Sequence, residues 1–410
     1  CRRCNRVMDT GFAQAVTMKK FQPIALIAVF IFFFFSGIVL MSYLQAAFRG
    51  TTLILGVDVY PRWVGAQAAL RGESPYSLET RQAIWDAIYG SRDLPNGNPF
   101  GFYYPPSIVT LLAPFIALRL SVEQAAIAGC AFLWALWGTF LLFWVIEEQE
   151  KQKVVVALFL LSGLFFRPAF SNYILGQSAL FCVVMIAAAW MCLRYEWTIA
   201  AGICLALALV KPSNTILPVV LLLALNYRSK NILFSFLITN LVLFVPPTFL
   251  LGWWVPDFLA DISKYSFENQ PAWTIQNLWT IPGILNLILS VTLMVWGYRR
   301  MDTLLLVASA LAFNSLFVPH TADYDLIMFI LLVLWIHKQR PLIPGGAIGR
   351  ALLLLILLWL PWVSLYPFAG RVEDWYVVIW KIYPTVLLLT SILLIARQTR
   401  ETQPNMIGQP

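Results

Sequence analysis

Residues 24–44 read IALIAVFIFFFFSGIVLMSYL and contain no charged side chain. A helix that crosses a bilayer needs about 20 predominantly apolar residues, whereas the apolar core of a cleaved signal peptide has only about 7–15. Further apolar runs follow along the chain. We therefore expect residues 24–44 to form a retained transmembrane helix.

The composition of the whole chain points the same way. Of its 410 residues, 60% are hydrophobic and 12% are charged. Soluble globular domains have about 25% charged residues. The composition excludes a soluble globule and indicates a polytopic membrane protein.

Apolar runs bounded by charged or turn residues predict an all-α protein with twelve transmembrane helices. Several runs are shorter than the roughly 20 residues of a straight crossing, so we expect those helices to begin above the lipid plane or to line a cavity. The short run at 106–118 contains Pro114 and is typical of an interfacial or re-entrant segment. The predicted spans lie near residues 24–44, 124–146, 154–170, 178–193, 198–210, 212–226, 232–250, 282–298, 303–318, 324–337, 350–364 and 377–396.

These spans place most basic residues in short connections on one side, which the positive-inside rule assigns to the cytoplasm. Both termini are then predicted to be cytoplasmic. The acids gather on the outer side, and the absence of an acid from the middle of a span argues against an ion-coupled transporter. Because the charge excess of +8 is spread among the inner loops, it does not indicate a nucleic-acid-binding patch.

Two outer segments are long, at residues 45–123 and 251–281. Connections of this length usually carry function or short helices of their own. Residues 63–70 predict such a helix, ending near Gly72, and Pro61 favours a late start for it. We therefore expect interfacial helices in both outer segments.

The N-terminal residues stand apart from the rest of the chain. Met18-Lys19-Lys20 before an apolar run is typical of a natural start, so we expect residues 1–17 to be an extension and 18–410 to form a single integral membrane domain. Cys1 and Cys4 lack two further ligands at zinc spacing, and we expect no metal there.

Asp58 lies in Gly56-Val57-Asp58-Val59-Tyr60, where the first apolar run has given way to the first outer segment. One interpretation is that Asp58 only caps the following helix, as aspartates often do. The other is that it performs chemistry at the membrane surface. The residues alone leave both interpretations open.

Several short motifs, taken in their order and spacing, resemble the signatures of glycosyltransferase family 87. The resemblance extends from about Ile54 to about Asp325. The motifs that carry it are Asp58-Val59-Tyr60, Ala68 to Tyr76, Phe102 to Pro106, Pro114-Phe115, Gly176-Gln177-Ser178, Leu209 to Pro212, Asn269-Gln270-Pro271 and Val318-Pro319-His320.

This resemblance implies a GT-C fold, in which two long outer loops build a cavity at the outer membrane surface. It also implies transfer of a hexose, with mannose as the first expectation, from a polyprenyl phosphate carrier to a lipid or glycan acceptor, with inversion. The mycobacterial mannosyltransferases that extend phosphatidylinositol mannosides are an example of such a reaction. The lipid-linked sugar is a co-substrate, and no cofactor or metal is expected.

The resemblance also suggests roles for individual residues. Asp58 is the expected base, because it aligns with the aspartate of the family motif. The expected donor-phosphate ligands are Lys211, His320 and Arg62, with Arg167 as a further candidate, and the expected sugar or lipid contacts are Tyr60, Tyr104, Gln177, Asn269 and Gln270.

Other interpretations of these residues remain. Lys211 interrupts an apolar run, where it is either functional or extends to the lipid headgroups. His320 is either a phosphate ligand or a structural histidine. Most aromatic residues are expected to be interfacial anchors, with Tyr104 and Gln177 as the first candidates for substrate contacts. Asp323, Asp325 and His320 lie close in sequence but predict no definite metal geometry. For the whole protein, a flippase or exporter of a glycolipid and a noncatalytic lipid-binding protein are the alternatives.

Overall fold

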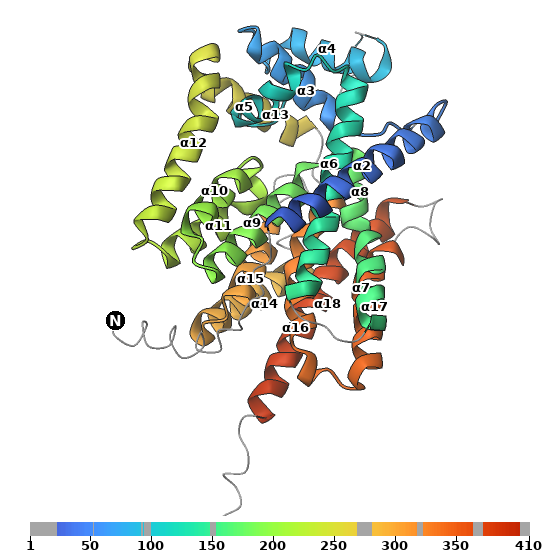
Figure 1. Cartoon of the computed structure of the whole chain (residues 1–410), viewed down its shortest axis with the longest axis vertical. Helices are drawn as coiled ribbons and strands as arrows, with labels where there is room; N and C mark the ends of the chain where they lie inside the picture. The colour runs from blue at the N-terminus through green and yellow to red at the C-terminus, as the bar shows by residue number, and fades with distance from the viewer. Residues whose placement is uncertain are drawn as a thin grey trace, which may run out of the picture.

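The computed structural model describes residues 23–51, 53–91, 93, 100–147, 153–268, 281–317, 323–363 and 372–401 (Figure 1). In these residues the regular secondary structure is helical throughout. The all-α prediction is therefore confirmed for the described part of the chain. The helices are α2 (Pro23–Phe48), α3 (Val59–Leu70), α4 (Leu78–Tyr89), α5 (Ser107–Ile116), α6 (Val122–Glu147), α7 (Lys153–Leu164), α8 (Arg167–Leu175), α9 (Ser178–Arg194), α10 (Thr198–Ala208), α11 (Pro212–Leu225), α12 (Lys230–Leu251), α13 (Val255–Glu268), α14 (Ile281–Arg300), α15 (Thr303–Ser315), η2 (Asp323–Phe329), α16 (Ile330–Lys338), η3 (Arg340–Leu342), α17 (Gly346–Val363) and α18 (Val372–Glu401).

Five helices in the described residues are long and apolar enough to cross a membrane, within α2, α6, α12, α14 and α18. A sixth crossing results if α7 and α8, which meet at a bend of 41°, count as one broken span. The chain is thus a multi-pass membrane protein. Each of the twelve predicted runs contains helix, but α9, α10, α11 and α15 are shorter than a straight crossing. The number twelve therefore stays a prediction.

One set of helix ends meets at the side that the sequence assigns to the cytoplasm. A guanidinium nitrogen of Arg194, at the end of α9, lies 3.2 Å from the carboxylate of Glu147, at the end of α6. Trp190 donates a hydrogen bond of 3.0 Å to Thr303 at the start of α15, and the ammonium of Lys338 lies 5.8 Å from the Trp190 ring centre. Contacts among these ends agree with one shared face, while its orientation in the cell stays a prediction.

Helices α3, α4, α5 and α13 gather at the other end of the molecule, at the top of Figure 1. They come from the two long predicted outer segments. Arg81 of α4 forms an ion pair with Asp261 of α13, and the rings of Tyr76 and Phe258 lie 5.9 Å apart. The Tyr76 hydroxyl also donates to the carbonyl of Tyr104, at 2.9 Å. These contacts join the two segments into one structural unit.

The first helix of this unit differs from the prediction. Helix α3 begins at Val59, not at residue 63, so the expectation of a late start is wrong. Pro61 fits here because the first turn of a helix has no intrahelical acceptor for its N–H groups, and proline lacks one. The early start places Asp58 directly before the helix.

The Arg81–Asp261 ion pair supports a stability prediction. Both side chains are largely buried, with 12% and 8% of their surface exposed. Removal of one partner of a buried pair typically costs about 3–5 kcal/mol, because the other charge loses its compensation. We expect Arg81→Ala to lower the free energy of unfolding accordingly in a denaturant titration in detergent.

The matched control is the Arg71–Glu73 pair, whose side chains are 59% and 56% exposed. Exposed pairs contribute about 0–1 kcal/mol. Arg71→Ala should therefore unfold almost as the wild type does. Equal losses in the two variants would show that the Arg81–Asp261 pair does not join the segments.

Candidate active site

Two glycines bring the chain before α3 against the turn between α8 and α9. The N–H of Gly56 donates to the carbonyl of Ile174 at 2.7 Å, and that of Asp58 donates to Leu175 at 3.0 Å. A Cβ at Gly56 would lie 2.9 Å from the Cβ of Ala126, and a Cβ at Gly176 would lie 2.4 Å from a methyl group of Val59. These close approaches set Asp58 beside Gln177.

We expect Gly176→Ala to disturb this junction. Gly176 has φ +78°, a left-handed conformation that costs an alanine about 1–2 kcal/mol, and the added methyl would also displace Val59. Overpacking typically adds about 1–3 kcal/mol. Thermal unfolding and transfer assays should show a loss of both stability and activity.

Gly90→Ala is the matched control. Gly90 also has positive φ, +69°, but a Cβ there meets no described atom within 4 Å. Gly90→Ala should lose only the stability that the left-handed conformation costs an alanine, and it should keep its activity. If both variants behaved alike, close packing at Gly176 would not be what positions Asp58.

Asp58 occupies the N-cap position of α3, but its side chain accepts no hydrogen bond from the first turn of that helix. The carboxylate instead interacts with the side-chain amide of Gln177. Desolvation raises the pKa of Asp58, although the charge of Arg62, the hydrogen bond from Gln177 and the charge of Lys211 each act to lower it. The side chain of Asp58 therefore does not cap α3, although the residue occupies the N-cap position.

Arg62 fastens the same junction. Its Nε donates to the carbonyl of Asp58 at 2.8 Å, and Nη2 donates to the carbonyl of Gly176. The guanidinium carbon lies 5.3 Å from the ring centre of Tyr104, and only 9% of the residue is exposed. The geometry gives Arg62 a structural role, while its predicted contact with phosphate stays a prediction.

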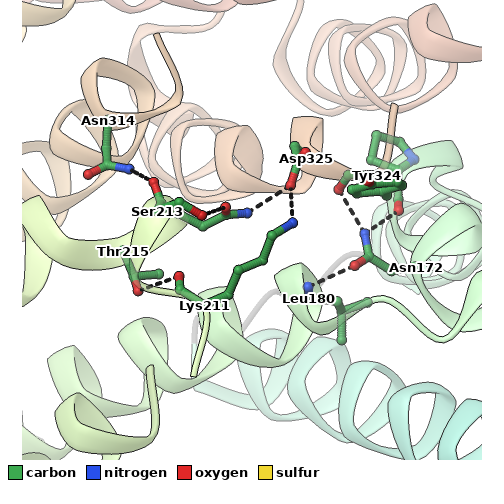
Figure 2. Close-up of polar contacts among 10 residues, drawn as sticks. Asn172, Leu180, Lys211, Ser213, Thr215, Asn314, Tyr324 and Asp325 are labelled. Atoms are coloured by element: carbon green, nitrogen blue, oxygen red, sulfur yellow. Dashed lines mark hydrogen bonds and ion pairs between the residues drawn. The ribbon is translucent and has the colours of Figure 1, made fainter. Parts of the chain in front are cut away.

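Lys211 approaches the site from the turn between α10 and α11. Figure 2 shows its side chain extending to Asp325, whose carboxylate lies 3.0 Å from the ammonium nitrogen. That nitrogen also lies 5.0 Å from the ring centre of Tyr324, and 17% of the Lys211 side chain is exposed. Asp325 holds the charge of Lys211 inside the protein. The structure therefore does not show Lys211 extending to the lipid headgroups.

Asn172 of α8 connects the turn that carries Gln177 with the segment that carries Asp325. Its Nδ2 donates to the carbonyl of Tyr324 at 2.7 Å, and its Oδ1 accepts from the N–H of Leu180 at 2.9 Å (Figure 2). Its carbonyl accepts from the N–H of Gln177 at 2.7 Å. Asn172 is fully buried, and its backbone and side chain together tie the turn that carries Gln177 to the segment that carries Asp325.

The site thus contains a carboxylate with a raised pKa beside Gln177 and a partly exposed ammonium group paired with Asp325. Comparison with known proteins adds a family to this geometry. The sequence pattern of glycosyltransferase family 87 matches residues 102–333, which is more than half of the chain. The chain belongs to glycosyltransferase family 87. No curated protein and no solved structure matches it.

Membership of family 87 makes the chain a membrane glycosyltransferase. The matched range includes Tyr104, Gln177, Lys211 and Asp325, whereas Asp58 and Arg62 precede it. The structure brings these two parts together, because the N–H of Asp58 and the side chain of Arg62 donate to the carbonyls of Leu175 and Gly176. The charges of Lys211 and Asp325 also act on the pKa of Asp58.

The other predicted site residues of this glycosyltransferase lie in different places. Tyr104 is partly exposed beside Arg62, and burial raises the pKa of its hydroxyl. Tyr60 is only 4% exposed and packs in a hydrophobic cluster with Trp63 and Ala126 of α6, so its sugar or lipid contact stays a prediction.

Arg167 donates to the carbonyl of Pro361 at 3.1 Å, which gives it a structural contact with α17. Three predicted ligands lie outside the described residues, namely His320, Asn269 and Gln270. Within the described residues, no group of three His, Cys, Asp or Glu side chains is placed to hold a metal.

Sequence reasoning missed Asp325 and Asn172 as members of the site. From the sequence, Asp325 is only an outer acid and part of a trio with His320 and Asp323 that predicts no metal geometry. The sequence does carry a signal for Asp325. This acid stands at the head of the apolar run 324–337, and a charged side chain is costly there, as that of Lys211 is between its own apolar neighbours. Asn172 offered no such signal, because an isolated asparagine in a helix is commonplace.

Proposed function

We propose that this family 87 enzyme has a GT-C-type architecture and transfers a hexose, with mannose as the first candidate, from a polyprenyl phosphate to a lipid or glycan acceptor. The observation that carries this proposal is the convergence of Asp58 and Lys211 at one site. A base and a cation are the two groups that sugar transfer from a phosphate carrier needs. Metal is not required for this assignment.

In the proposed reaction, the acceptor hydroxyl oxygen attacks the anomeric carbon while Asp58 takes the hydroxyl proton. The bond from the anomeric carbon to the phosphate oxygen breaks, and the polyprenyl phosphate leaves with the electron pair. Lys211 stabilises the charge on that phosphate. The raised pKa of Asp58 suits this role, because a general base is most effective when its pKa lies near the working pH.

We place the reaction at the outer face of the plasma membrane, with both termini in the cytoplasm. The distribution of basic residues supports this orientation. A lipid-linked donor is consistent with it, because nucleotide sugars are cytoplasmic and a carrier lipid brings the sugar across. Gln177, which interacts with the carboxylate of Asp58, and Tyr104 are the first candidates for sugar contacts.

The test is a product assay with the purified protein in proteoliposomes. We expect polyprenyl-phosphate mannose and a lipid-extract acceptor to yield a product heavier by one hexose in mass spectrometry, and GDP-mannose to yield none. A product from GDP-mannose would contradict the proposed donor. Translocation of a labelled glycolipid without a new glycosidic bond would instead identify a flippase.

A further inference from the structure

Asp325 is one of the most deeply buried acids of the described residues, with 2% of its surface exposed. Its Oδ1 accepts a hydrogen bond from the ammonium of Lys211 at 3.0 Å (Figure 2). The same oxygen accepts from Nδ2 of Asn214 at 2.7 Å. A buried carboxylate is costly unless charged and polar partners compensate it. Lys211 occupies the N-cap position of α11, and Asn214 lies in the first turn of that helix.

That first turn is itself fixed by neighbouring helices. Asn214 is fully buried, and Asn314 of α15 donates to the carbonyl of Ser213. The segment that carries Asp325 is held by Asn172, through the carbonyl of Tyr324. The carboxylate therefore has a defined place even though its partner Lys211 has a long, flexible side chain.

The contact also leaves part of the ammonium group available. Lysine has three N–H donors, and Asp325 accepts one of them. The Lys211 side chain keeps 17% exposure, whereas that of Asp325 keeps 2%. A phosphate that reaches this ammonium group would thus meet Lys211 and not the carboxylate behind it.

We propose that Asp325, supported by Asn214, is a positioning residue that fixes the ammonium of Lys211 for the phosphate of the lipid-linked donor. This inference rests on the proposed function. Without Asp325, the lysine would regain its rotamer freedom and would lose the charged partner that keeps it in the protein interior. Asp325 itself does not contact the reacting atoms.

The test measures binding of polyprenyl phosphate to the purified full chain in nanodiscs, which needs no catalysis. A hydrogen bond to a charged group contributes enough free energy that its loss weakens binding by about tenfold. We expect a loss of that size for Lys211→Met and for Asp325→Asn. Because Asp325 acts through Lys211, the double variant should bind no more weakly than either single variant. Independent roles would instead multiply the two losses, and that result would overturn the inference.

Two further variants keep the test decisive if Asp325→Asn folds poorly. Asn214→Ala removes one partner of Asp325 and leaves the ion pair, so we expect a loss of about threefold. Asp302→Asn makes the same acid-to-amide change at the start of α15, the end of that helix away from Asn314 and Ser213, and should leave binding unchanged. Unchanged binding in Asp325→Asn or Asn214→Ala would overturn the inference. If the wild type binds no polyprenyl phosphate, the proposed donor fails, and this role fails with it.

Discussion

Replacement of Asp58 by asparagine is expected to reduce sugar transfer by about 10²–10⁴-fold, the usual contribution of a general base. The amide keeps the shape of the side chain but cannot accept the hydroxyl proton. Initial rates with polyprenyl-phosphate mannose measure the effect. Glu79→Gln, at an exposed acid in the first turn of α4, is the control and should keep full activity.

The same variant should remain folded. Burial raises the pKa of Asp58, so the protein favours the protonated carboxyl and the ionised form at neutral pH destabilises the fold. A neutral asparagine removes that cost, and its thermal unfolding temperature should equal or exceed that of the wild type. Loss of activity together with loss of stability would instead point to a structural role.

The raised pKa also predicts the acidic limb of the pH–rate profile. Asp58 must be ionised to act as a base, so activity falls as pH decreases through its pKa. The fall should be centred above about 3.9, the value of an unperturbed aspartate. Rates measured from pH 4 upwards in the wild type check this expectation.

The second large effect is expected for Asn172→Leu. Leucine removes the bonds from Nδ2 to Pro168 and Tyr324 and the bond from the N–H of Leu180 to Oδ1. Each buried group left without a partner costs about 1–3 kcal/mol. The variant should lose about 3–5 kcal/mol in denaturant unfolding, and the fraction that folds should transfer sugar poorly, because Gln177 and Asp325 are no longer held together.

Asn240→Leu is the control for that change. Asn240 is half-buried in α12 and donates to the carbonyl of Phe236 in its own helix, at 2.8 Å. Its loss should cost about 1 kcal/mol or less. If Asn172→Leu and Asn240→Leu lowered the free energy of unfolding equally little, Asn172 would not connect the turn that carries Gln177 with the segment that carries Asp325.

The sequence predicted the helical class and the membrane location because both follow from composition and from the length of apolar runs. It predicted less about the number of crossings. Helices such as α10 (Thr198–Ala208) and α15 (Thr303–Ser315) are apolar, yet too short for length alone to decide whether they cross.

The candidate site shows the same division. Asp58, Gln177 and Lys211 could be singled out because they lie in ordered motifs or interrupt apolar runs. The placement of Asp58 beside Gln177, however, depends on the close approach of Gly56 and Gly176, which is a tertiary contact that no local pattern encodes. Supporting residues such as Asn172 were missed for that reason.

The anomeric configuration of the product tests the central claim most directly. Asp58 as a base predicts a single displacement, in which the acceptor attacks from the face opposite the phosphate. NMR of the purified glycoside formed from a donor of defined configuration should therefore show inversion at the anomeric carbon. A product that retains the configuration of the donor would indicate a double displacement through a covalent intermediate and would contradict the account.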